Sequence, residues 1–163
     1  MRLIDLRVVF TEFDTLEELP PEDQELIQKA RESMRLAYAP YSQFHVGAAL
    51  RLENNVIVSG NNQENASYPE GLCAERVALF AAGAMHAGIK IKTLAVVASS
   101  VIHKINKPVT PCGACRQVIA EYEHRYRQPI RLIMTGETGK ILTADGISQL
   151  LPYLFNGDDL NAK

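Results

Sequence analysis

The sequence predicts an α/β protein in which helices cover both faces of a mixed sheet, giving a three-layer sandwich. Strand-like and helix-like segments alternate along the chain in the order β-α-ββ-α-β-α-ββ-α. Residues 94–98, Leu-Ala-Val-Val-Ala, form a continuous apolar run that is typical of a central strand buried on both faces. We expect a central sheet of five strands and one extra strand near the amino terminus.

The first half of the chain contains the extra strand, a helix and a hairpin. Residues 3–10 are rich in β-branched and aromatic side chains, so we expect a strand that covers a sheet edge or a subunit contact, within an extension over residues 1–19. Residues 20–38 begin with two prolines and acidic residues and continue with apolar side chains at helical spacing. Residues 46–52 and 56–59 flank a Glu-Asn-Asn turn and predict a hairpin. A polar loop then leads to residue 71.

The second half contains two longer helices and another pair of strands. Residues 73–85 are small and apolar nearly all round, which predicts a helix buried against the sheet. Residues 112–126 carry apolar side chains at helical spacing. Residues 130–135 and 140–143 predict strands on either side of Gly-Glu-Thr-Gly, and residues 147–151 a short helix that a proline ends.

Composition limits the possible functions. A chain of 163 residues with 47% hydrophobic and 22% charged residues fits one compact domain over residues 1–163. It has no apolar stretch long enough for a membrane span, and charges interrupt its first apolar run, so we expect a cytoplasmic protein without a signal peptide. The net charge of −2 offers no basic surface for nucleic acid. A small uncharged substrate is therefore expected, and neither nucleic acid nor a membrane as partner.

All three cysteines lie in two short motifs, residues 71–76 (Gly-Leu-Cys-Ala-Glu-Arg) and 110–116 (Thr-Pro-Cys-Gly-Ala-Cys-Arg). Each motif opens a predicted helix, where the partial positive charge of unpaired N–H groups lowers a thiol's pKa and favours the thiolate. Cys112 and Cys115 share one helix face. If the two helix starts are neighbours, both sulfurs converge with that of Cys73. Three protein ligands with one open position are typical of a catalytic zinc.

The motifs also match a signature: a metal ligand, one residue, a glutamate, and later Pro-Cys-x-x-Cys, as in zinc deaminases. Over residues 39–160 the sequence resembles the cytidine deaminases, specifically the short homotetrameric type with three cysteine ligands. The resemblance includes both cysteine motifs and three further segments, residues 41–49, 62–69 and 150–155. It implies the same three-layer fold.

The resemblance implies one zinc per chain, held by the three cysteines, and assigns the acid–base role to Glu75. This group would take a proton from water, protonate N3 of the base and deliver a proton to the leaving amine. Zinc with three thiolates carries a formal charge of −1, which opposes ionisation of a bound water. We expect Arg76 and Arg116, beside the cysteines, to donate hydrogen bonds to sulfur and offset that charge.

The resemblance further assigns the substrate-binding residues. Asn62 and Glu64 match positions that bind the ribose hydroxyls, Phe44 and Phe155 match positions that line the pyrimidine, and Tyr68 matches a position that lines the site. Phe155 would come from a neighbouring subunit of a homotetramer. The implied activity is hydrolytic deamination of cytidine and deoxycytidine to uridine and deoxyuridine, a step of pyrimidine salvage.

Three alternatives stay open. A structural zinc domain would need a fourth ligand, and the sequence has no further cysteine and no suitably spaced histidine. A thioredoxin-like protein could use Cys112 and Cys115, but this leaves Cys73 and Glu75 unexplained. A blasticidin-type deaminase would share the zinc motifs but not the Asn-Gln-Glu-Asn stretch at residues 62–65.

Overall fold

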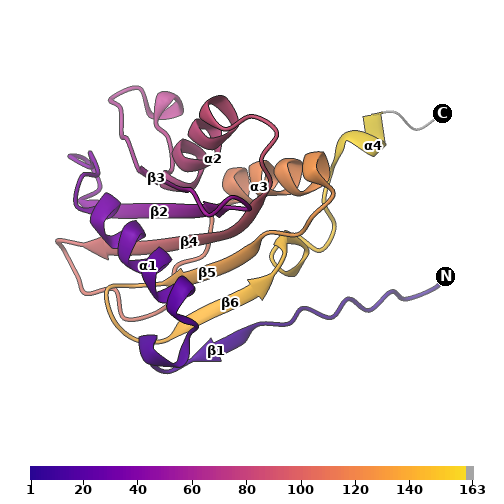
Figure 1. Ribbon diagram of the computed structural model, residues 1–163, viewed down its shortest axis with the longest axis horizontal. Coiled ribbons are helices and arrows are strands. Elements are labelled where there is room, and N and C mark those ends of the chain that lie inside the picture. Colours follow the sequence, from indigo (N-terminus) through magenta and orange to yellow (C-terminus); the bar gives the residue numbers. More distant parts are fainter. Residues whose placement is uncertain (161–163) are drawn as a thin grey trace.

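The computed structural model describes residues 1–160, and these residues form one mixed sheet with helices on both faces (Figure 1). The strands are β1 (Thr11–Phe13), β2 (Phe44–Leu52), β3 (Ile57–Asn61), β4 (Ile91–Ser100), β5 (Arg131–Thr135) and β6 (Ile141–Asp145). The α-helices are α1 (Pro21–Met34), α2 (Ala74–Met85), α3 (Gly113–Tyr126) and α4 (Gly157–Leu160). Three 3-10 turns complete the elements: η1 (Leu16–Glu18), η2 (Tyr68–Glu70) and η3 (Ile147–Gln149). The α/β three-layer architecture is confirmed.

The strand order in the sheet is β1-β6-β5-β4-β2-β3. Strand β4 is antiparallel to β2 and parallel to β5, and every other neighbouring pair is antiparallel. A parallel pair needs a crossover connection, and here α3 supplies it between β4 and β5. Helix α3 therefore begins beyond the carboxyl end of β4, and α2 begins beyond the carboxyl end of β3.

The central strand β4 contributes to the core on both faces of the sheet. Leu94 and Val96 pack in the cluster beneath α2 and α3, whereas Ala95 and Val97 pack in the cluster beneath α1. All four are buried, as the apolar run at residues 94–98 predicted. The site below is thus built on a strand that both core layers hold in place.

Helix α2 approaches the sheet at Gly60 of β3. A Cβ atom at this position would lie 2.5 Å from the backbone nitrogen of Ala78 and 2.6 Å from the carbonyl oxygen of Ala74. Only a residue without a side chain allows this close approach. The contact fixes the first turns of α2, and hence the residues at its start, against the end of β3.

The expected strand over residues 3–10 is wrong in its position. The extra strand is β1, which pairs with β6 from Thr11 opposite Thr143 to Phe13 opposite Ile141, while residues 2–10 run away from the sheet edge (Figure 1). Strand β6 ends at Asp145, and the chain turns at Gly146, where φ is 111°. Residues before Thr11 therefore find no neighbouring strand, although their composition favours an extended chain.

The other differences are small. The short helix expected at residues 147–151 is the single turn η3, and α4 follows after Pro152 without having been predicted. No helix in the described range 1–160 is long and apolar enough to cross a membrane.

Candidate active site

The structure brings the two cysteine motifs together at the starts of two helices. Cys73 caps α2, Cys112 caps α3, and Cys115 lies in the first turn of α3. The Sγ atom of Cys112 lies 3.7 Å from that of Cys73 and 3.5 Å from that of Cys115, and all three sulfurs lie within 4.8 Å of one another. Tetrahedral zinc with Zn–S bonds of about 2.3 Å places its sulfurs about 3.8 Å apart. The cluster therefore fits one zinc ion.

The thiols of this cluster titrate unequally. A hydrogen bond from Cys115 and the guanidinium of Arg76 lower the pKa of Cys73 to about 5. The same hydrogen bond, together with burial, raises the pKa of Cys115 well above its ordinary value. A first thiolate thus forms readily on Cys73 and opposes a second one nearby. A divalent cation removes this opposition, because it neutralises the accumulating negative charge.

Glu75 lies in the first turn of α2, two residues after Cys73. It is only 4% exposed and lines the same cavity as the cluster. Burial raises the pKa of its carboxyl, and the neighbouring Cys73 thiolate raises it further. A carboxyl in this environment holds a proton more strongly than one in water, which suits a group that must both accept and return protons.

Arg76 contacts the cluster directly. Its Nη2 atom lies 3.6 Å from Sγ of Cys73 and also donates to the carbonyl oxygen of Gly71 at 3.3 Å. Its Nε atom is buried and has no partner within residues 1–160. The positive charge predicted beside sulfur is therefore present at Arg76.

Arg116 is placed differently from the expectation. Its Nε donates to the carbonyl oxygen of Pro111 at 2.8 Å, its Nη1 to that of Leu150 at 2.9 Å, and its Nη2 to Oγ1 of Thr110 at 3.2 Å. None of its hydrogen bonds within the described residues reaches a sulfur. Arg116 instead joins the loop before Cys112 to the carboxy-terminal segment.

A cavity of about 730 Å³ opens beside the cluster and Glu75. Its walls come from the start of β2, the loop after β3 and the loop before α3. Four of the five predicted substrate residues line it: Phe44, Asn62, Glu64 and Tyr68. The rings of Tyr41 and Tyr68 stand at its wall with their centres 6.1 Å apart. Its size is that of a small-molecule site.

Asn62 and Glu64 shape this cavity through hydrogen bonds to its walls. Oδ1 of Asn62 accepts from the N–H of Val46 at 2.7 Å, and its Nδ2 donates to the carbonyl oxygen of Phe44 at 2.9 Å. Glu64 accepts from the N–H of Tyr41 at 2.9 Å and from the N–H and hydroxyl of Ser42. Although burial alone would raise the pKa of Glu64, these hydrogen bonds hold it below its ordinary value. Glu64 is thus a carboxylate.

Phe155 lies outside the cavity of its own chain and is 56% exposed. Its carbonyl oxygen accepts a hydrogen bond of 2.7 Å from Nε2 of Gln117, which fastens this segment along α3. Ser42 and Thr110 were not predicted as site residues, yet Ser42 orients Glu64 and both residues line the cavity. Ser42 lies two residues after Pro40 in the loop between α1 and β2, and a hydroxyl in such a turn, within the matched segment 41–49, is the signal that could have pointed to it.

Comparison with known proteins gives the same picture. Residues 20–127 match the family described as the cytidine and deoxycytidylate deaminase zinc-binding region. Cytidine deaminase from Halalkalibacterium halodurans is 41% identical over 138 residues, covering 85% of this chain and 97% of that protein. The enzyme of the same name from Sporosarcina psychrophila is 40% identical, covering 85% and 94%. The chain belongs to the cytidine and deoxycytidylate deaminase family.

The solved structures agree with this assignment. The crystal structure of cytidine deaminase from Burkholderia pseudomallei superimposes with a TM-score of 0.69 at 38% identity, covering 80% of this chain and 97% of that one. Blasticidin-S deaminase from Bacillus cereus is a more distant relative, 29% identical over 138 residues. The match to a zinc-binding region and the three-sulfur cluster together identify one zinc site in the chain.

Proposed function

We propose that the chain catalyses the hydrolytic deamination of cytidine and deoxycytidine to uridine and deoxyuridine, releasing ammonia. The observation that carries this proposal is the cavity itself, which has the three-cysteine cluster and a buried carboxyl on one side and polar side chains on the other. The relatives that are about 40% identical to this chain over their aligned residues are named cytidine deaminases.

Zinc held by Cys73, Cys112 and Cys115 would supply an activated water. Glu75 then moves the protons: it accepts one from that water and gives it to N3 of the pyrimidine, and it next takes the second proton of the added hydroxyl and delivers it to the leaving amine. Its burial supports these transfers, because the raised pKa makes the Glu75 carboxylate a stronger base for the proton that it takes from water. Arg76 offsets the negative charge of the thiolates.

The remaining cavity residues would hold the nucleoside. The Glu64 carboxylate accepts hydrogen bonds from the sugar hydroxyls, the Asn62 side-chain amide also bonds to the sugar, and Phe44 and Tyr68 contact the flat base. Phe155 would complete the pocket of a neighbouring subunit in a homotetramer, which its exposed position outside its own cavity supports. Residues 1–163 would form one catalytic domain, with residues 1–19 as an extension, acting in the cytoplasm in pyrimidine salvage without nucleic-acid or membrane partners.

The first test combines activity with zinc content. The purified protein should consume cytidine, measured by loss of its ultraviolet absorbance, and a zinc chelator should stop the reaction. Glu75→Gln should keep one zinc per chain and lose roughly 10²–10⁴-fold in kcat, because a general acid–base group is removed. Near-normal turnover of this variant would remove Glu75 from the mechanism.

Two controls accompany this test. Glu70→Gln changes a carboxyl in η2 outside the cavity, so it should leave both zinc content and rate unchanged. Blasticidin S is assayed in parallel, and faster turnover of blasticidin S than of cytidine would assign the chain to that more distant activity.

A further inference from the structure

Residues 2–10, here called the arm, run in an extended conformation away from the sheet and end far from the domain (Figure 1). The arm lies ahead of the family match, which starts at residue 20. Its large apolar side chains are between 36% and 85% exposed: Leu3, Ile4, Leu6, Val8, Val9 and Phe10. So much exposed apolar surface on one short segment marks an interaction site.

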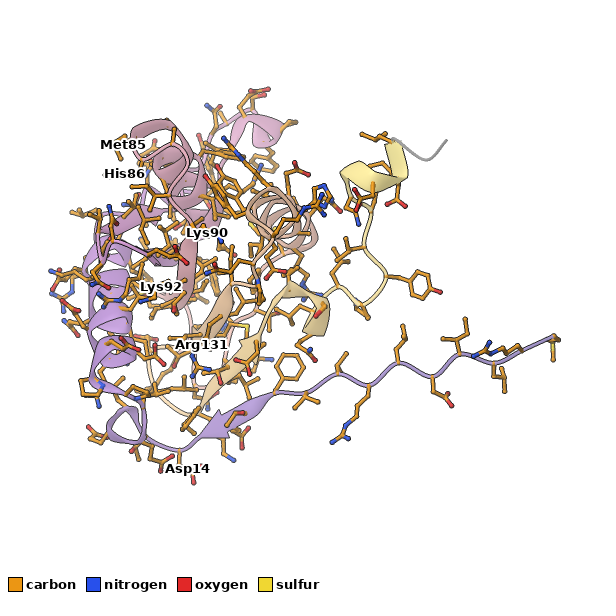
Figure 2. All side chains as sticks on the ribbon, turned by 45° about the vertical axis from the view of Figure 1, so that its right-hand side comes forward. Asp14, Met85, His86, Lys90, Lys92 and Arg131 are labelled. Carbon is orange, nitrogen blue, oxygen red and sulfur yellow. The ribbon has the colours of Figure 1, made fainter. Side chains whose placement is uncertain are left out.

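The side chains of the arm form two different faces, because successive residues of an extended chain point to opposite sides. Figure 2 shows side chains standing alternately on either side of the arm's ribbon. The even-numbered face is apolar from residue 4 onward: Ile4, Leu6, Val8 and Phe10. The odd-numbered face has two opposite charges between apolar residues: Leu3, Asp5, Arg7 and Val9. This alternation is the pattern of a strand that has one buried face.

The backbone of the arm is almost unpaired. The N–H of Val9 donates to Oε1 of Gln149 at 2.7 Å, and within the described chain the backbone groups of residues 2–8 bond to nothing. In an extended chain the polar groups of alternate residues point to opposite edges. The backbone N–H of Val9 points toward its own domain. The backbone N–H and C=O groups of the even-numbered residues therefore point to the opposite edge of the arm, away from the domain. Such a free edge is a template for another strand.

We propose that the arm pairs antiparallel with the arm of a second copy of this chain, about a two-fold axis at Leu6. In this register Leu6 faces Leu6 of the partner subunit, Ile4 faces the partner's Val8, and Leu3 faces the partner's Val9. Asp5 faces the partner's Arg7, and the symmetry repeats this ion pair once more. The outward groups of Ile4, Leu6 and Val8 make the hydrogen bonds, in agreement with the direction that Val9 sets.

The charges select this register among the alternatives. A shift by one residue places Asp5 and Arg7 opposite apolar side chains and mixes the two faces. A shift by two places either Asp5 opposite Asp5 of the partner subunit or Arg7 opposite the partner's Arg7. Like charges directly opposite each other destabilise a strand pair, whereas opposite charges stabilise it. Only pairing about Leu6 places each Asp5 opposite the partner's Arg7, so the arm is complementary to a copy of itself.

A symmetric disulfide tests the axis. Paired residues of this kind have Cα atoms about 5.5 Å apart, within the range that a disulfide spans. Leu6→Cys should therefore cross-link two chains under mild oxidation, seen as a dimer on a non-reducing denaturing gel. Val8→Cys is the matched control on the same face, because its two copies would lie about 13 Å apart in this register. The unaltered chain, with its three cysteines, gives the background.

Charge reversal tests the register independently. Adding Arg7→Asp to Leu6→Cys places like charges opposite each other and should slow cross-linking by roughly tenfold. Adding Asp5→Arg as well restores complementarity and should restore the rate. Glu17→Arg, a reversal outside the arm, should change nothing. Far-ultraviolet circular dichroism reports that each variant is folded.

The proposal is overturned by equal cross-linking at positions 6 and 8, by no cross-linking above background, or by a rate that ignores the charges. These outcomes do not depend on the deaminase activity. They also do not depend on other subunit contacts, because a cross-link at position 6 reports only where the two arms meet.

Discussion

Asn62 and Glu64 hold the wall of the cavity and also present polar atoms to it. Asn62 bonds to the backbone of Phe44 and Val46 at the start of β2. Glu64 bonds to Tyr41 and Ser42. Each oxygen of Glu64 still has room for a further hydrogen bond, because a carboxylate oxygen accepts more than one. A carboxylate already oriented by Ser42 loses little freedom when a sugar hydroxyl binds, which favours affinity.

Glu64→Gln is therefore expected to act mainly on substrates that carry a sugar. Its kcat/KM for cytidine should fall by an amount equivalent to roughly 1–3 kcal/mol, because one charged acceptor of the sugar is lost. Ser42→Ala, which keeps the carboxylate but loosens it, should have a smaller effect. Turnover of free cytosine, already poor, should be unchanged, and cytosine consumed as fast as cytidine would contradict the role.

The placement of single residues was predictable where a local motif encodes it. Cys73, Cys112 and Cys115 meet, with Glu75 nearby, because two short motifs open two helices. The contacts of Arg116 do not follow, because its partner Leu150 lies 34 residues away and no local pattern encodes that approach. A guanidinium donates to the carbonyl oxygens that the folded chain places near it, and these cannot be read from the neighbouring sequence.

Helix α3 also fastens the segments that follow it. Oε1 of Glu123 accepts the N–H of Ile130 before β5 and the N–H of Ile147 after β6, both at 2.8 Å. Burial raises the pKa of this carboxyl, although the two backbone hydrogen bonds oppose the shift. One side chain thus replaces backbone partners that two loops lack.

Glu123→Ala should lower the free energy of unfolding by roughly 1–3 kcal/mol, because two N–H groups lose their acceptor. Glu123→Gln keeps an acceptor oxygen and is the matched control. A carboxyl whose pKa is raised by folding binds its proton more tightly in the native state. Its contribution to the free energy of unfolding is therefore full at pH values below its pKa in the unfolded chain, and it declines as the pH rises through its pKa in the folded protein. Urea unfolding from pH 4 to 8 should show the wild type losing stability relative to Glu123→Gln as pH rises. A constant difference would contradict this sign.

Five of the six strands were predictable because each carries a run of buried side chains that its own sequence displays. The sixth was misplaced because pairing depends on a distant partner: β6 ends at Asp145, which limits β1 to residues 11–13. The arm has the composition of a strand and no neighbour within its own chain.

In the whole molecule the carboxy-terminal segment places Phe155 outside the cavity of its own chain. Arg116 holds Leu150, and Gln117 holds the backbone of Phe155, so the ring stands exposed beside α3. A ring held firmly outside its own site is well placed to enter another.

Mixing two impaired variants tests this arrangement. Phe155→Ala should lower activity by the equivalent of roughly 1–3 kcal/mol if the ring stacks on a base. Co-refolding Phe155→Ala chains with Glu75→Ala chains should give more activity than the sum of the separate variants, because some sites combine an intact Glu75 with a donated Phe155. A strictly additive mixture, with subunit exchange verified by mass spectrometry, would place the ring in its own subunit.

Cys73 and Cys112 are 39 residues apart in the chain, and the segment between them contains α2 and the central strand β4. An ion bound to both sulfurs closes this segment into a ring and removes the open conformations from the unfolded ensemble. A covalent bridge across a loop of this length is worth about 4 kcal/mol in the chain-entropy account. The zinc ion at the active site therefore also stabilises the fold as a reversible cross-link between α2 and α3. The fraction of folded chains rises with the concentration of free zinc.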